Sequence, residues 1–140
     1  MCMYLKKGLH QIVPHYATHD IECVKLMENF RYSDDDIHMK LIDSPVQDFT
    51  YIIGKKYGPI SIKPSITGIP GVHRITKGFH SFASLQTALK FKDSTYYYIK
   101  CKVCKCVIPK GSWYYDGLVG LTANKGYVSD SIIIKEIMEV

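Results

Sequence analysis

From Lys77 to Tyr115 the chain reads KGFHSFASLQTALKFKDSTYYYIKCKVCKCVIPKGSWYY. The opening segment, Gly78–Phe82, is typical of a short buried strand or a tight turn. Apolar residues then recur at the spacing of one helix face, behind a serine placed to cap the first turn, which predicts one short helix. The apolar face consists of Phe82, Leu85, Ala88 and Leu89, and the cap is Ser81 or Ser84.

A strand is predicted after this helix. Apolar residues and lysines alternate with a period of two, as in a strand with one buried face and one wet face. The alternation runs through Tyr97, Ile99, Cys101 and Val103, with Lys100 and Lys102 between them. The segment Pro109–Gly111 then ends the strand.

The earlier part of the chain predicts further strands. Residues 1–19, interrupted by a proline, favour a short strand or arm. Residues 20–27 favour a core strand, with a helix running to Phe30 as the alternative. Residues 41–46 form a connector, and the β-branched and aromatic run at 49–53 indicates another strand.

The tail, residues 127–138, is predicted to be a strand covered on both sides. Its apolar residues fall on both faces, with Ile132, Ile134 and Met138 on one and Ile133 and Ile137 on the other.

The segment 57–72 is the longest predicted loop, because its glycines and prolines are too dense for regular structure. Loops of this length in compact domains are often functional. We therefore expect it to form a wall of a ligand site. The residues concerned are Gly58, Pro59, Pro64, Gly68, Pro70 and Gly71.

Length and composition are those of one globular domain, residues 1–140, with 46% hydrophobic and 22% charged residues. We predict an α+β fold, in which a bent and mainly antiparallel sheet of about five to seven strands carries one or two short helices. No apolar run approaches the roughly 18 to 20 residues that a transmembrane helix requires, so no membrane role is expected.

The five cysteines do not indicate a disulfide framework, because their number is odd and three of them crowd one segment. A reducing cytoplasm is the expected compartment. Cys101, Cys104 and Cys106 also suggest zinc, with His80 or His73 as a further ligand. On a continuous strand, however, Cys101 faces away from the other two, although a β-bulge after Val103 would leave room for convergence. We predict buried thiols and no metal.

The net charge of +5 favours an anionic partner such as a nucleotide, a nucleic acid or an acidic protein surface. Lysines on solvated strand faces explain the same charge. Of the 18 basic residues only Arg31 and Arg74 are arginines.

Aromatic residues flank the predicted strand at both ends, at Tyr96–Tyr98 and Trp113–Tyr115. Rings beside lysines suit the stacking of a base and the pairing of a phosphate, although strands also favour aromatic residues for packing alone. His80, between two phenylalanines, is either a core histidine or a site residue.

The order of these segments resembles the ADP-ribosyltransferase (PARP-like) fold. The segments that carry the resemblance are Cys23–Lys25, Gly78–Phe82, Tyr98–Val103 and Tyr127–Asp130. The chain also resembles small phage and gut-bacterial proteins, through a Tyr-x-x-Gly-Lys-x-Tyr segment at Tyr51–Tyr57 and an Ile-Pro-Lys-Gly-Ser segment at Ile108–Ser112.

The resemblance implies a nicotinamide pocket formed by Lys25 and by His80 or Ser81, and a catalytic glutamate near residues 125–127. No glutamate stands there. Without an anion opposite the oxocarbenium-like centre, the transition state loses its main electrostatic support. We therefore expect a binding module on an enzyme-like scaffold, with no catalytic residue, and not an active transferase.

The expected function is that of a phage-type accessory, anti-defence protein that binds and sequesters a nucleotide or an NAD-derived signal in the host cytoplasm. Such a nucleotide is expected as a ligand and not as a cofactor. The alternatives are an active ADP-ribosyltransferase and a small inhibitor that docks on a host protein or a nucleic-acid machine. The predicted ligand-binding residues are Lys25, Arg74, Lys77, Phe79, His80, Ser81, Tyr114 and Tyr115.

Overall fold

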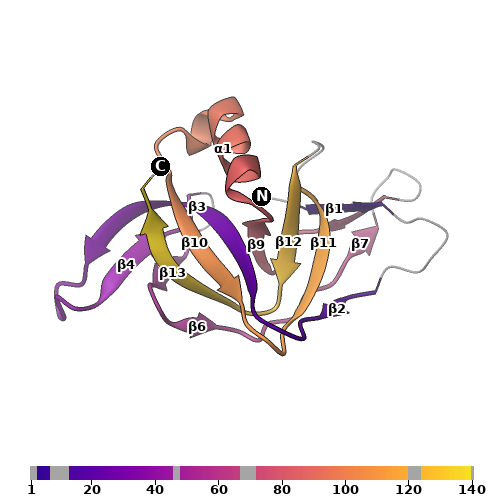
Figure 1. The fold of residues 1–140 in the computed structure, drawn as a ribbon, viewed down its shortest axis with the longest axis horizontal. Coiled ribbons are helices and arrows are strands. Elements are labelled where there is room, and N and C mark those ends of the chain that lie inside the picture. The colour runs from indigo at the N-terminus through magenta and orange to yellow at the C-terminus, as the bar shows by residue number, and fades with distance from the viewer. Residues whose placement is uncertain (1–2, 7–12, 46–47, 67–71, 120–123, 140) are drawn as a thin grey trace.

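The computed structural model describes residues 3–6, 13–45, 48–66, 72–119 and 124–139. Within them a strongly bent antiparallel sheet carries one α-helix (Figure 1). The helix is α1 (Leu85–Ser94), and the strands are β1 (Met3–Lys6), β2 (His15–Tyr16), β3 (Ile21–Tyr32), β4 (Lys40–Asp43), β5 (Thr50–Ile52), β6 (Lys56–Tyr57), β7 (Ser65–Ile66), β8 (Val72–Ile75), β9 (Phe79–Phe82), β10 (Lys102–Ile108), β11 (Trp113–Val119), β12 (Lys125–Ser129) and β13 (Ile132–Met138).

Strand β3 organises the sheet. The order is β6-β13-β10-β3-β9-β12-β11-β1-β8-β7, with β2 beside β11 and with β4 and β5 extending from β3. The prediction of an α+β fold with a bent, mainly antiparallel sheet is confirmed. The predicted strand number is wrong, because thirteen strands are found in the described residues. Several of them have only two to four residues and pair along the margins, where a sequence pattern is too short to reveal them.

A helix forms where the sequence predicts one, with Ser84 as its cap, but it begins at Leu85, so Phe82 belongs to β9 and not to the helix. The Ser84 backbone is extended, and its Oγ accepts a hydrogen bond from the Thr87 amide at 3.2 Å. Buried Ala88 and the flanking Leu85 and Leu89 pack on the face of the sheet that carries Val24 and Leu26.

The strand expected from Tyr97 onward begins later, at Lys102. Residues Tyr96–Tyr98 form a 3₁₀ turn instead, in which the Tyr98 amide donates to the Thr95 carbonyl at 3.0 Å. The Tyr98 ring packs against Phe91 of the helix, with the ring centroids 5.1 Å apart. This contact with the helix holds the segment out of the sheet and leaves Ile99 56% exposed.

The connector predicted at residues 41–46 is wrong in its first half, because Lys40–Asp43 is strand β4. Leu41 pairs with Arg31 on one side and with Ile52 on the other, and Ile42 is fully buried. Pairing on both sides satisfies the β4 backbone, which a propensity argument over so short a segment does not reveal.

The tail consists of two strands, β12 and β13, joined at Asp130 and Ser131. Between β10 and β13 the register shifts at Lys105/Cys106, and Lys135 is the extra residue. This bulge moves Ile137 onto the face of Ile132 and Ile134, and Met138 onto the other face. The predicted placement of Ile137 and Met138 is therefore wrong.

The sheet buries both faces. One face packs under α1, and Cys101 and Val103 belong to that cluster. The opposite face is covered by the β4–β6 segment through Ile42 and Tyr51, and it carries Cys23, Cys104 and Cys106. The prediction that Cys101 faces away from Cys104 and Cys106 is confirmed. In the described part of the chain, no helix combines the length and apolar character needed to cross a membrane.

Candidate functional site

An aromatic pocket opens on the face of the sheet opposite α1. Its volume is about 470 Å³, and a lysine stands among its lining residues. The two walls come from segments far apart in sequence, one at β5 and β6 and the other just before β9. We call this the aromatic pocket, and it is lined by Phe49, Tyr51, Tyr57, Gly58, Ile60, Thr76, Lys77, Gly78 and Phe79.

Three rings hold one wall in place. Phe49, Tyr51 and Tyr57 pack edge to face in a triangle, with centroid separations of 4.6 Å, 5.5 Å and 5.1 Å. The Tyr57 hydroxyl also accepts a hydrogen bond from the Ile52 amide at 2.7 Å. Phe49 is 40% exposed and Tyr57 is half-buried, whereas Tyr51 is buried, so the ring surface that a planar ligand can reach on this wall belongs to Phe49 and Tyr57.

Two glycines allow the backbone to close around the pocket. Gly58 and Gly78 have φ angles of +100° and +134°, which residues with a Cβ rarely adopt. A Cβ at Gly58 would overlap the Asp130 carbonyl, and one at Gly78 would overlap the Val128 and Ile62 side chains. Gly58 therefore lets its segment pack closely on the Asp130–Ser131 connection, and Gly78 lets its segment pack closely on β12.

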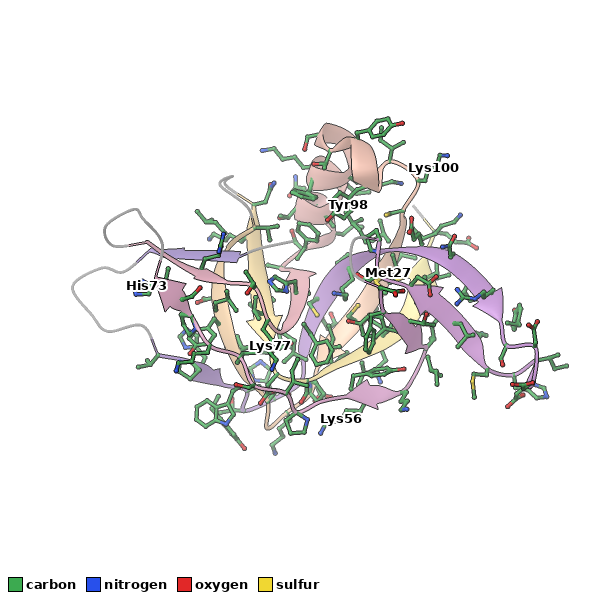
Figure 2. All side chains as sticks on the ribbon, turned by 180° about the vertical axis from the view of Figure 1, so that it is seen from behind. Met27, Lys56, His73, Lys77, Tyr98 and Lys100 are labelled. Carbon is green, nitrogen blue, oxygen red and sulfur yellow. The ribbon has the colours of Figure 1, made fainter. Side chains whose placement is uncertain are left out.

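Lys77 supplies positive charge to the pocket. It is exposed and precedes β9, near the middle of the molecule in Figure 2. No ion pair of Lys77 with a carboxylate is found among the described residues. An exposed ammonium beside ring faces suits an anionic group attached to a planar one.

His80 fixes the loop that presents Lys77. Its Nδ1 and Nε2 each lie 3.1 Å from a carbonyl oxygen, that of Gly78 and that of Ile75 respectively. Burial lowers the pKa of His80 to about 4, so at neutral pH the uncharged ring donates its single N–H to one of these carbonyls. His80 therefore holds the turn and does not line the pocket.

Lys25 is buried behind the Tyr51 wall. Its side chain on β3 is 8% exposed, and its Nζ donates to the His80 carbonyl and lies 5.8 Å from the Tyr51 ring centroid. Within the described residues no carboxylate forms an ion pair with it. Desolvation lowers the pKa of Lys25, while the thiols of Cys106, Cys23 and Cys104 oppose that shift.

These thiols and Lys25 form a two-by-two array on adjacent strands. Cys23 lies opposite Cys106, and Lys25 lies opposite Cys104. The hydrogen bond from Cys106 is the main cause that lowers the pKa of Cys23, with smaller contributions from Ser81 and Lys25. Burial raises the pKa of Cys106 well above its usual range, and that of Cys104 to about 12. The Cys23 and Cys106 thiols lie opposite each other, so a thiolate at Cys23 is stabilised by its partner thiol.

Ser81 is fully buried on the same face, and its hydroxyl makes no hydrogen bond of normal length with the described residues. It nevertheless faces the Cys23 thiol closely enough to lower its pKa.

The predicted site residues divide into three groups. Lys77 and Phe79 line the aromatic pocket, whereas Lys25, His80 and Ser81 lie behind it. Three others lie outside that lining. Exposed Arg74 is on β8, Tyr114 on β11 packs against Tyr127 and His15, and buried Tyr115 packs with Ile75 and Val128.

The residues that sequence reasoning missed are the aromatic ones of the β5–β6 wall. The β-branched and aromatic run at 49–53 marked a strand there, but nothing local indicated which segment it would face. Within the loop predicted at residues 57–72, Tyr57, Gly58 and Ile60 line the pocket, but Ser65–Ile66 is strand β7 and β8 begins at Val72, so the prediction of no regular structure is wrong there. Residues 67–71 of that loop lie outside the described residues.

In the described part of the chain, no three His, Cys, Asp or Glu side chains converge as the ligands of a metal ion do.

Comparison of the chain with protein-family models, with curated proteins and with solved structures gave no match.

Proposed function

We propose that the protein binds a nucleotide or an NAD-derived molecule in the aromatic pocket. The observation that carries the proposal is the meeting of a fixed triangle of rings with an exposed lysine in one pocket of about 470 Å³. Any nucleobase can stack on an aromatic ring, because every base has a π-face. A phosphate can pair with the ammonium of Lys77.

The size and lining also support this class of ligand. Pockets of roughly 300 to 1,000 Å³ with aromatic walls and a few polar groups are usual for small molecules and cofactors. Phe79 also lines the pocket, and its ring centroid lies 6.3 Å from that of Tyr51. The bent antiparallel sheet with one helix further supports an ADP-ribosyltransferase-like scaffold as part of the proposal.

The biological role in the proposal is sequestration of the ligand by a phage-encoded protein in the host cytoplasm. It rests on the resemblance to small phage and gut-bacterial proteins. Sequestration requires that the protein binds its ligand without converting it. Incubation of the protein with labelled NAD and acceptor proteins tests whether label is transferred to the acceptors.

A thermal-shift panel tests the binding. The panel contains NAD, ADP-ribose, cyclic ADP-ribose isomers and cyclic di- and trinucleotides. A ligand at a hundred times its dissociation constant stabilises the native state by about 2.7 kcal/mol, which raises the melting temperature by several degrees. We expect at least one member to do so, and the proposal is wrong if none does.

Two matched pairs of variants locate the site. Lys77→Ala should weaken binding through loss of the phosphate contact, whereas Lys90→Ala, on the exposed side of α1, should not. Phe49→Leu removes a stacking face worth about 1 to 3 kcal/mol, and Tyr32→Leu removes an exposed ring elsewhere. If both variants of a pair lose the same amount of binding affinity, the ligand binds outside the aromatic pocket.

A further inference from the structure

We propose that Cys23 and Cys106 form an oxidisable pair that closes to a cross-strand disulfide when a small peroxide enters the fold. The proposal concerns the thiol array behind the pocket and is independent of ligand binding. It assigns a covalent modification site to buried thiols that the pocket does not use.

Strand register brings the two sulfurs together. Cys23 and Cys106 are direct partners on antiparallel β3 and β10, and both side chains point to the face opposite α1. Direct antiparallel partners have Cα atoms about 4.5 to 5.5 Å apart, which is within the range of about 4.4 to 6.8 Å found for disulfides. The register of β3 against β10 runs without a shift through this pair, because the bulge at Lys105/Cys106 belongs to the pairing of β10 with β13.

The other described thiols are placed differently. Cys104 lies opposite Lys25 and not opposite a cysteine. Cys101 points to the α1 face of the sheet, so the sheet separates it from the pair. Register therefore selects one partner for Cys23.

The surroundings favour Cys23 as the thiol that reacts first. The Cys106 thiol lies opposite Cys23 and is the main cause that lowers its pKa despite burial, with smaller contributions from Ser81 and Lys25. A thiolate is the nucleophile in thiol oxidation. Cys106 keeps its proton, which suits the second thiol of the pair.

The reaction balances with hydrogen peroxide as the oxidant. The Cys23 thiolate attacks one peroxide oxygen, the O–O bond breaks, and hydroxide leaves to take up a proton, which gives a sulfenic acid on Cys23. The Cys106 sulfur then attacks the Cys23 sulfur, an S–S bond forms, the S–O bond breaks, and water leaves. Two thiols lose two electrons in total, and one peroxide is reduced to two waters.

Peptide mapping of the full chain tests the pairing. The protein is treated with hydrogen peroxide, unfolded, alkylated and digested without reduction. We expect a linked pair of peptides that carries Cys23 and Cys106, is lighter by two hydrogen atoms than the two thiols, and separates on reduction. If both cysteines remain alkylated, or if Cys23 is linked to Cys101 or Cys104, the proposal is wrong.

Variants test the order of events. Cys106→Ser should leave a sulfenic acid on Cys23 that a cyclic 1,3-diketone traps, whereas Cys101→Ser should form the linked pair as the parent does. Lys25→Met should slow the loss of the Cys23 thiol several-fold by removing the neighbouring amine. If Cys106→Ser does not fold, the mapping of the parent chain still decides the pairing, and diketone capture at Cys106 in place of Cys23 would overturn the assigned order.

Discussion

Lys25 is buried in the structure, although the sequence alone suggests a solvent-exposed lysine. A lysine in a strand is usually a solvated cation, and the sequence predicts Lys25 as a ligand-binding residue. The structure buries it, with a backbone carbonyl, a ring face and three thiols around it. Removing an ammonium from water costs several kcal/mol unless it is well paired. Lys25 therefore lowers the free energy of unfolding wherever it remains charged.

Replacing Lys25 with methionine should leave the free energy of unfolding at neutral pH unchanged or raise it, because an apolar chain of similar length carries no desolvation cost. Lys25→Ala should lower it by about 2 kcal/mol or more through the cavity left behind. Chemical denaturation measures both values. Lys90→Met on exposed helix surface serves as the control, with a change expected within about 0.5 kcal/mol.

The same variants give a pH dependence with a defined sign. Between the lowered folded-state pKa of Lys25 and its ordinary value of 10.5, the unfolded chain binds more protons than the folded chain. The stability contribution of Lys25 therefore rises with pH in that window. The advantage of Lys25→Met over the parent should shrink as the pH approaches 10.5, and an advantage that stays constant would show that folding does not lower the pKa of Lys25.

Helix α1 was predictable at the scale of one element because its determinants are local. The apolar spacing and the capping serine lie within a few residues of each other, and only the choice between Ser81 and Ser84 stayed open. The cap geometry decides it, since Ser84 Oγ accepts from the Thr87 amide.

Ser84→Ala should lower the free energy of unfolding by about 1 kcal/mol, because an amide in the first turn of the helix loses its acceptor. Thermal or denaturant unfolding measures the change. Gln86→Ala, at an exposed position in the same turn, should change stability by no more than about 0.5 kcal/mol. Equal effects of the two substitutions would mean that the Ser84 hydroxyl does not stabilise the helix.

Other elements were not predictable, because their determinants are not local. Strand β4 exists because β3 and β5 lie on either side of it. The bulge that places Ile137 and Met138 depends on the register of β10 against β13. The turn at Tyr96–Tyr98 depends on the packing of Tyr98 against Phe91. Each outcome needs a neighbour that is distant in sequence or a contact that spacing alone does not encode.

At the scale of the whole molecule, the aromatic pocket exists because the bent sheet brings β5 and β6 to the segment before β9. The sequence predicts Lys77 and Phe79 as ligand-binding residues. It also predicts that the loop beginning at Tyr57 forms a wall of the site. It also predicts Arg74, which lies near Lys77 along the chain, and Tyr114 and Tyr115, which follow the predicted strand. The sheet order places β8 and β11 several strands away from β13 and β6, so these three residues lie outside the pocket lining.

An NMR titration of isotopically labelled protein with ADP-ribose tests ligand binding in the aromatic pocket most directly. ADP-ribose carries a base, two phosphates and two riboses, so it offers both a ring and an anion to the pocket. The largest saturable shifts should fall on the amides of Lys77 and Gly78 and on the rings of Phe49 and Tyr57, with Tyr114 unmoved. An absence of saturable shifts, or shifts centred on Tyr114 and Tyr115, would contradict binding in this pocket.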